Sequence, residues 1–251
     1  MPLTFAHPAA VLPFSRNSKY VNFLAMVLGS MSPDFEYFLR GMPSGEIGHT
    51  FTGFVAFNLP LIVIIYLIYK RYIHRTLFQH LPSFLQEPYS PKPNSTVLLK
   101  VLVFLYSAIF GMLTHVVWDS FTHLDGYMVR NLAILTFPVH ILDYQILVFK
   151  FLQHGSTLVG ITVILGYMYI RAKRNRSNRD ETTSPKQKFM YWGHIAFSTI
   201  LVFCLWYFID EVPVQAYGVI VVRIIDSALI SLLLISIYFN YINRVKVGNY
   251  S

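Results

Sequence analysis

Residues 98–118 have the sequence LLKVLVFLYSAIFGMLTHVVW, which contains a single lysine and no carboxylate. As an α-helix this stretch would be about 30 Å long, which matches the hydrocarbon core of a lipid bilayer. A soluble protein would have few ways to cover so long an apolar helix. The stretch therefore predicts a membrane-spanning helix.

Four further apolar stretches meet or approach the length needed to cross the bilayer, namely 51–69, 154–170, 190–209 and 215–241. A sixth apolar run, Val21 to Met31, is too short to cross a bilayer, and it ends at Ser32-Pro33-Asp34, where proline disfavours a continuing helix. We expect it to be an interfacial or re-entrant helix. The predicted fold class is all-α: a polytopic transmembrane helical bundle of about five spans plus this short N-terminal helix.

The composition of the chain agrees with a membrane location. Of its 251 residues, 55% are hydrophobic and 13% are charged, against about 25% charged residues in soluble domains. The formal net charge is +8, but the Lys and Arg residues gather in short segments between the apolar runs. This pattern favours membrane lipids as the surroundings and argues against a nucleic-acid partner. The single cysteine, Cys204, lies in an apolar run, so neither a disulfide nor a cysteine zinc cluster is expected.

Basic residues predict the orientation, because cytoplasmic loops are enriched in Lys and Arg. Lys70 and Arg71 end the first span, a strongly basic loop follows the third, and Arg244 and Lys246 follow the last. We expect the N-terminus outside and the C-terminus in the cytoplasm, with no cleaved signal peptide. The expected organisation is a metal-site domain (1–170), a basic cytoplasmic loop (171–188) and two C-terminal spans (189–251).

Ionisable residues at membrane depth are costly and are functional candidates by default. Under the predicted topology they collect at the outer ends of the helices. His49 precedes the first span, His115 lies near the end of the second, and the N-terminal segment adds further polar groups. The full set of candidates is His7, Asp34, His49, His115, Asp119, His123 and His154.

The strongest local motif is Thr114-His115-Val-Val-Trp-Asp119-Ser-Phe-Thr-His123. Spacing of four places His115, Asp119 and His123 on one helical face. Imidazole nitrogens and a carboxylate are suitable zinc ligands, and a carboxylate can bridge two metal ions. The alternative is a polar stripe that faces a water-filled groove or a neighbouring helix.

The other candidates have simpler explanations when taken alone. Asp34 could be a cap or turn residue, and His49 precedes Thr50, which could cap the first span. His154 looks like part of a helix start. His140 and Asp143 are near enough in sequence to join the site, but Pro138 obscures their geometry.

Arg223 and Asp226 lie three residues apart in the last span, which favours an intrahelical ion pair that eases insertion. They are the only charges that would favour a conventional transporter with midplane binding groups.

Several motifs together resemble an uncharacterised family of bacterial membrane proteins, over about the first 170 residues. They are MPLTFAHPAA at 1–10, GSMSPDFEYF at 29–38, HVVWDSFTH at 115–123 and LQHGSTL at 152–158. That family is similar to membrane-bound metal-dependent hydrolases and, more distantly, to zinc-dependent phospholipase C. The resemblance implies a bacterial cytoplasmic membrane protein with His7, Asp34, His49, His115, Asp119 and His123 as metal ligands.

His154 falls at the last histidine of the phospholipase pattern, but Leu158 stands where the pattern has glutamate. The resemblance therefore implies two zinc ions, with Asp119 as the bridging carboxylate and with Asp34 and Asp119 as the catalytic residues. The leading hypothesis is a membrane-embedded hydrolase of a phosphoester, possibly lipid-linked, at the outer face. The alternative is a non-enzymatic metal-binding or envelope-structural protein.

Overall fold

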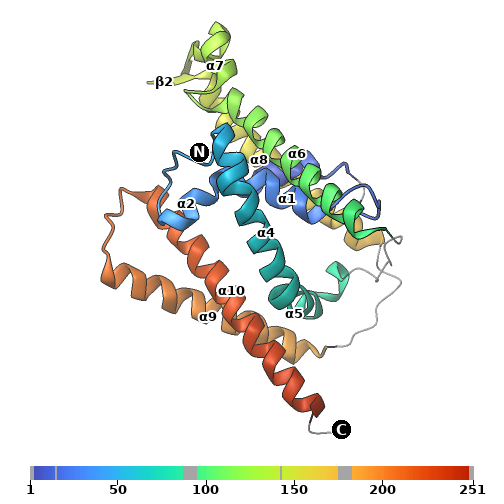
Figure 1. Cartoon of the computed structure of the whole chain (residues 1–251). Coiled ribbons are helices and arrows are strands. Elements are labelled where there is room, and N and C mark those ends of the chain that lie inside the picture. Colours follow the sequence, from blue (N-terminus) through green and yellow to red (C-terminus); the bar gives the residue numbers. More distant parts are fainter. Residues whose placement is uncertain (1–2, 15, 87–94, 142, 175–182, 249–251) are drawn as a thin grey trace. The chain divides into compact units, whose positions relative to one another are not determined.

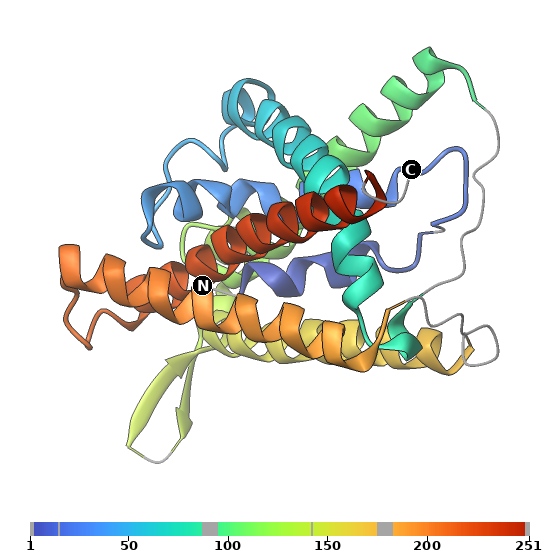
Figure 2. The ribbon, with the colours of Figure 1, turned by 90° about the horizontal axis from the view of Figure 1, so that it is seen from below.

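The computed structural model describes residues 3–14, 16–86, 95–141, 143–174 and 183–248 (Figures 1 and 2). Five helical segments are long and apolar enough to cross a membrane. This confirms the predicted all-α class and the predicted number of spans. The segments are Phe51–His80, Val97–Asn131, Val148–Arg174, Pro185–Ile209 and Tyr217–Ile242.

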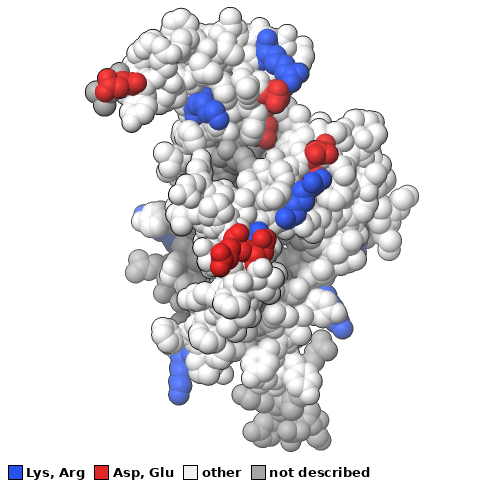
Figure 3. Space-filling view, turned by 90° about the vertical axis from the view of Figure 1, so that its left-hand side faces the viewer, with Lys and Arg blue, Asp and Glu red and all other residues white. Residues whose placement is uncertain are grey.

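Few charged side chains interrupt the molecular surface, which is largely uncharged on the face drawn in Figure 3. Cys204 is exposed on its helix, as expected for a residue that faces lipid. Of the loops expected from the sequence, 87–94 and the basic stretch 175–182 lie outside the described residues.

The chain forms two compact units. Unit 1 comprises Met1–Phe35, Glu46–Val63 and Ser90–Ile170, and unit 2 comprises Glu36–Gly45, Ile64–Tyr89 and Arg171–Ser251. All the candidate site residues belong to unit 1. Its elements are η1 (Thr4–Val11), α1 (Phe23–Met31), η2 (Ser32–Asp34), α3 (Phe51–Gly53), η3 (Phe54–Asn58), the start of α4 (Leu59–Ile68), α6 (Val97–Thr122), α7 (Tyr127–Asn131), η6 (Ala133–Thr136), β1 (Pro138–Ile141), β2 (Tyr144–Leu147) and most of α8 (Val148–Arg174).

Helices α1 and α6 cross at very short range because each contributes a glycine to the contact. A Cβ atom at Gly29 would lie 2.2 Å from the carbonyl oxygen of Ala108, and one at Gly111 would lie 2.2 Å from that of Met26. Small residues at such positions allow helix backbones to approach closely. This contact fixes α1 against the half of α6 that leads to His115.

The short helix α1 agrees with the expected non-spanning helix. Asn22 caps it by accepting a hydrogen bond from the backbone N–H of Ala25 at 3.2 Å, and the α-helix ends at Met31, just before Pro33. The chain then continues as the 3₁₀ turn η2. Thr50 caps the first span, as predicted, by accepting from the backbone N–H of Gly53 at 2.9 Å.

The third span differs from the prediction. Helix α8 begins at Val148, so His154 lies inside the helix and the expected helix start at this residue is wrong. An antiparallel hairpin that was not predicted precedes α8, with Val139 paired to Ile146 and Ile141 paired to Tyr144. Figure 2 shows this hairpin as an arm that projects from the helices of unit 1.

Unit 2 contains α2 (Phe35–Arg40), the end of α4, η4 (Tyr69–Ile73), α5 (His74–His80), η5 (Ser83–Leu85), α9 (Pro185–Ile209) and α10 (Tyr217–Gly248). Polar side chains connect its helices. Thr76 donates to Asn240 at 2.7 Å, and the hydroxyls of Tyr191 and Ser236 are hydrogen-bonded at 2.8 Å. Such buried hydrogen bonds satisfy polar groups that lipid would leave unpaired.

The predicted ion pair between Arg223 and Asp226 is wrong. Arg223 donates instead to the side chain and the backbone carbonyl of Asp210, the residue that directly follows α9. Its guanidinium also lies 5.1 Å from the ring of Trp206. Arg223 is therefore paired with the aspartate that follows α9 and not with the aspartate one turn away on its own helix. Within the described residues, Oδ2 of Asp226 has no hydrogen-bond partner.

Candidate metal centre

The candidate ligands come from four parts of unit 1 that are far apart in sequence. His7 lies on η1, Asp34 ends η2, His49 precedes α3, and α6 carries His115 and Asp119. His123 follows α6 as its C-terminal cap residue. The buried face of α6 places His115 and Asp119 one turn apart, as the spacing of four predicted.

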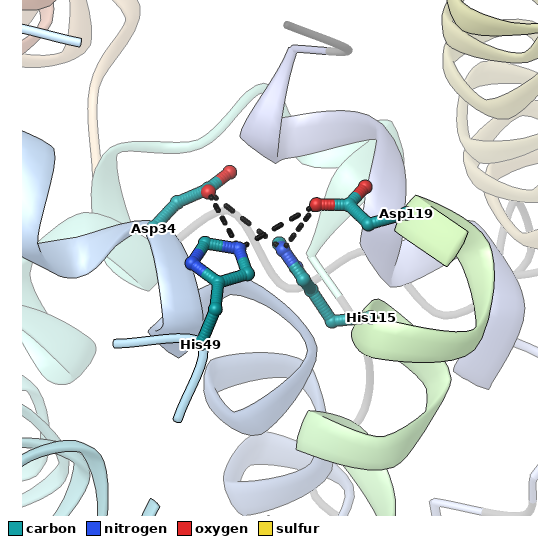
Figure 4. A group of neighbouring side chains, drawn as sticks. All are labelled: Asp34, His49, His115 and Asp119. Atoms are coloured by element: carbon teal, nitrogen blue, oxygen red, sulfur yellow. Dashed lines mark ion pairs between the residues drawn. The ribbon is translucent and has the colours of Figure 1, made fainter. Parts of the chain in front are cut away.

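Four of these residues form a compact cluster, in which one ligand atom from each of Asp34, His49, His115 and Asp119 lies within 4.8 Å of the others. Figure 4 shows the four side chains pointing toward one another. Oδ1 of Asp34 is 3.6 Å from Nε2 of His49 and 3.7 Å from Nε2 of His115. Oδ2 of Asp119 is 3.5 Å from Nε2 of His49 and 3.1 Å from Nε2 of His115.

Three of these distances, 3.5–3.7 Å, are longer than a normal hydrogen bond, and all four are close to the separation of two ligands on a shared cation. Zinc binds nitrogen and oxygen ligands at about 2.0–2.1 Å, so two tetrahedral ligands are separated by about 3.3 Å. The observed separations of 3.1–3.7 Å lie on both sides of that value. Nε2 of His115 is buried and makes no hydrogen bond with any described residue, although Oδ2 of Asp119 is nearby.

Asp119 presents its second oxygen to a different pair of histidines. Oδ1 lies 3.6 Å from Nε2 of His7 and 3.5 Å from Nδ1 of His123. In the described part of the chain, this buried oxygen has no hydrogen-bond partner. The carboxylate therefore faces two sets of nitrogen atoms, one on each oxygen.

A backbone carbonyl orients His115. Its Nδ1 lies 2.8 Å from the carbonyl oxygen of Ser30 on α1. Because a carbonyl oxygen can only accept, Nδ1 must carry the proton, and in the neutral ring Nε2 then has a free lone pair. This lone pair is available to a cation in the cluster. Metal-binding histidines generally have such a hydrogen bond on the other ring nitrogen.

Asp34 is held by a threonine from the N-terminal segment. The hydroxyl of Thr4 donates to Oδ2 of Asp34 at 2.7 Å, which leaves Oδ1 facing the histidines. Burial raises the pKa of the Asp34 carboxyl, since the ionised form loses its hydration there. A cation bound beside Asp34 would offset this cost.

His49 reaches the cluster because its loop packs tightly against η2. A Cβ atom at Gly48 would lie 2.1 Å from the carbonyl oxygen of Pro33, so only glycine allows this approach. Asn58 on η3 donates to the carbonyl of Gly48 at 2.7 Å and holds the loop from the other side. Gly48 is thus fixed next to Pro33, which brings His49 close to Asp34.

His7 is almost completely buried, and neither of its ring nitrogens has a hydrogen-bond partner among the described residues. Burial, reinforced by the nearby His115, lowers the pKa of His7 to about 3, so its imidazole is neutral at physiological pH. Its ring stacks on that of His115 at 3.9 Å between centroids. Unpaired, neutral and inward-facing nitrogens are what a metal ligand requires.

The cluster is closed on one side and open on the other. The side chains of His7 and His115 are 1% and 0% exposed, whereas those of His49 and His123 are 33% and 32% exposed. A small molecule would therefore approach past these two histidines.

Three candidates do not reach the cluster in the described structure. His154 is exposed on α8, while its neighbour Gln153 is buried. His140 is exposed on β1, and Asp143 is exposed in the hairpin turn.

The sequence did not indicate Thr4 or the carbonyl of Ser30 as supporting groups. A backbone carbonyl has no signature in sequence. The only available signal was the glycine at position 29, which permits the close helix contact.

These features define a helical membrane protein with a buried histidine and aspartate cluster that is able to hold metal. The chain belongs to the family described as Domain of unknown function (DUF4184), which it matches over residues 1–237. No curated protein and no solved structure matches it. The expected membership of an uncharacterised family is confirmed, whereas the comparisons do not support the expected likeness to hydrolases or phospholipase C.

Proposed function

We propose that this protein is a membrane-embedded hydrolase that holds two zinc ions and acts on a phosphoester. The observation that carries the proposal is the two-sided carboxylate of Asp119. One oxygen faces His49 and His115, and the other faces His7 and His123, at distances of 3.1–3.6 Å. A carboxylate so placed is suited to bridge two metal ions about 3.5–4 Å apart.

The ligands divide naturally between the two ions. Asp34, His49 and His115 would hold one ion and His7 with His123 the other, while Asp119 would contact both. Zinc ions bound in this way act as Lewis acids toward a phosphoester and lower the pKa of water toward 7, so no separate general base is needed.

The remaining groups of the site position these ligands. The Ser30 carbonyl and the Thr4 hydroxyl orient His115 and Asp34, and the open side between His49 and His123 admits the substrate.

We place the site at the outer face of a bacterial cytoplasmic membrane, with the N-terminus outside and the C-terminus in the cytoplasm. Trp118, next to the cluster, donates to Ser156 in the first part of α8 at 3.0 Å, and Arg171, Lys173 and Arg174 lie in the last turn of α8. About 22 Å of helix separates Ser156 from Arg171. The basic end is therefore the cytoplasmic one. A lipid-linked or other extracytoplasmic phosphoester is the expected substrate.

Orientation is tested with a single cysteine at the exposed position Lys186, in a Cys204→Ser background. We expect a membrane-impermeant maleimide to label Lys186→Cys in inverted vesicles but not in intact cells. Labelling in intact cells would move the cluster to the cytoplasmic side.

Metal stoichiometry in lipid nanodiscs tests the site itself. The wild type should retain two zinc ions per chain. Asp34→Asn should retain about one, because it removes a ligand of one ion only, whereas Asp119→Asn should lose both. His194→Ala is the matched control, since His194 is exposed on α9, where its ring hydrogen-bonds to the carbonyl of Met190, and it belongs to unit 2, whereas the candidate ligands belong to unit 1. No bound metal in the wild type would refute the site.

Activity is tested with chromogenic phosphate monoesters and diesters on the same samples. We expect hydrolysis by the wild type and by His194→Ala, loss on treatment with chelator, and loss in Asp34→Asn even though one ion remains. Two tightly bound ions without hydrolysis of any phosphoester would instead favour a non-enzymatic metal-binding protein.

A further inference from the structure

The segment between α6 and α8 forms a small folded element, here called the cap and defined as residues 124–141 and 143–147. Val129, Leu135 and Phe149 are buried in its centre, with Phe121, Met128, Leu147 and Val148 packed around them. The backbone N–H of Val148 donates to the carbonyl of Phe137 at 3.1 Å and closes the base of the hairpin. This core is shared with the ends of α6 and α8, which contribute Phe121, Val148 and Phe149, so the cap is packed on those two helices.

The cap nevertheless exposes large apolar side chains that this core does not use. Tyr127 and Ile134 are each 71% exposed, Phe137 is 64% exposed and Leu124 is 61% exposed. Among the described residues of the cap the charged side chains are Asp125, Arg130 and Asp143, and the first two neutralise each other at 2.7 Å. Exposed apolar surface on this scale marks a contact with membrane or protein.

One face of the hairpin is apolar, and both faces are exposed near the turn. Its strand register places Val139, Ile141, Tyr144 and Ile146 on one face, because side chains alternate along a strand. The other face carries His140 and Gln145 near the turn. Tyr144 is 71% exposed and Ile141 is 45% exposed, so the apolar face reaches beyond the core of the cap.

Lipid is the occupant that the surroundings favour. Opposite the metal ligands, α6 carries exposed apolar residues at spacings of three and four: Leu98, Leu102, Tyr106, Ile109, Leu113 and Val117. Leu124 and Tyr127 continue this apolar surface into the cap. One candidate membrane span, Val97–Asn131, extends into the cap, and the next, Val148–Arg174, begins directly after it. The 26 residues of α6 would measure about 39 Å, more than the roughly 30 Å of hydrocarbon, so if residues 98–118 cross the hydrocarbon, the cap reaches headgroup depth.

We propose that the cap is an interfacial membrane anchor, in which the apolar face of the hairpin and the side chains of Tyr127 and Ile134 lie among the lipids beside the metal cluster. Tyrosine is suited to this depth, because its ring is apolar and its hydroxyl can reach water or headgroups. The cap begins at Leu124, directly after His123. Its anchoring would hold that end of α6 at the level of the headgroups.

Adjacent positions on β2 provide a matched pair for the test. Spin labels are attached to Tyr144→Cys and, separately, to Gln145→Cys, each in the Cys204→Ser background and at one chain per nanodisc. We expect the label at 144 to be several-fold more accessible to oxygen, which concentrates in lipid, than to a water-soluble nickel complex. The label at 145 should show the opposite preference. Ile141→Cys, on the same face as Tyr144, replaces Tyr144→Cys if that variant does not fold.

Two results would overturn the proposal. Equal and high accessibility to nickel at positions 141, 144 and 145 would place the cap in water. Protection of position 144 that appears only when two chains share a nanodisc would identify a second copy, and not lipid, as the occupant.

Discussion

Replacing Gly29 by alanine tests whether the contact between α1 and α6 aims His115 into the cluster. The new Cβ atom would lie 2.2 Å from the Ala108 carbonyl oxygen, about 1 Å closer than an ordinary carbon–oxygen contact. The two helices must therefore separate by about that distance. Ser30 follows directly in the chain, so its hydrogen bond to His115, now 2.8 Å long, would stretch to nearly 4 Å and be lost.

The expected result is a fall in zinc affinity of about 10- to 100-fold, as is usual when the partner that orients a metal-binding histidine is removed. Affinity is measured by competition with a chelating dye on protein in nanodiscs. Gly166→Ala on α8 is the control, because a Cβ atom there meets nothing within 4 Å. Gly111→Ala strains the same contact from the other helix and should reproduce the loss. If both Gly29→Ala and Gly111→Ala fold and bind zinc like the wild type, the contact does not position His115.

Two further predictions concern the N-terminal segment. Thr4→Val removes the hydrogen bond to Asp34 at nearly constant side-chain volume and should weaken zinc binding by about tenfold. Thr4→Ser keeps the hydroxyl and should bind zinc like the wild type. Equal zinc affinities in all three proteins would mean that Thr4 does not orient the carboxylate of Asp34. The pKa of His7 is lowered to about 3 in the folded protein, so as pH falls below about 6.5 only the unfolded chain gains a proton on this ring. The metal-free wild type should therefore lose thermal stability over this pH range, and His7→Gln should lose less. Identical pH profiles of the two proteins would contradict a buried, neutral His7.

The features that the sequence predicted correctly depend on local pattern. Long apolar stretches are sufficient to recognise membrane-spanning helices, and a spacing of four is sufficient to place His115 and Asp119 on one face of a helix. The short helix before Pro33 was likewise predictable, because its length and its proline are both local properties.

The features that were missed depend on tertiary contacts. Arg223 had a carboxylate one turn away, but the structure pairs it with Asp210, which follows another helix, α9. The hairpin at 138–147 is too short and too apolar for its pairing to be evident from sequence. His154 was a plausible ligand by order along the chain, but its place on α8 turns it outward.

If the candidate ligands hold metal as proposed, their order along the chain has a consequence for how the protein is made. His7, Asp34 and His49 all precede the first span, whereas His115, Asp119 and His123 come at the far end of the second. A nascent chain that has inserted one span therefore holds only half of the donor atoms, and both oxygens of the central carboxylate are still to come. The complete donor set first exists when the second span has crossed the bilayer and α1 has docked on it. Metal uptake would then mark the completion of the N-terminal half during biogenesis.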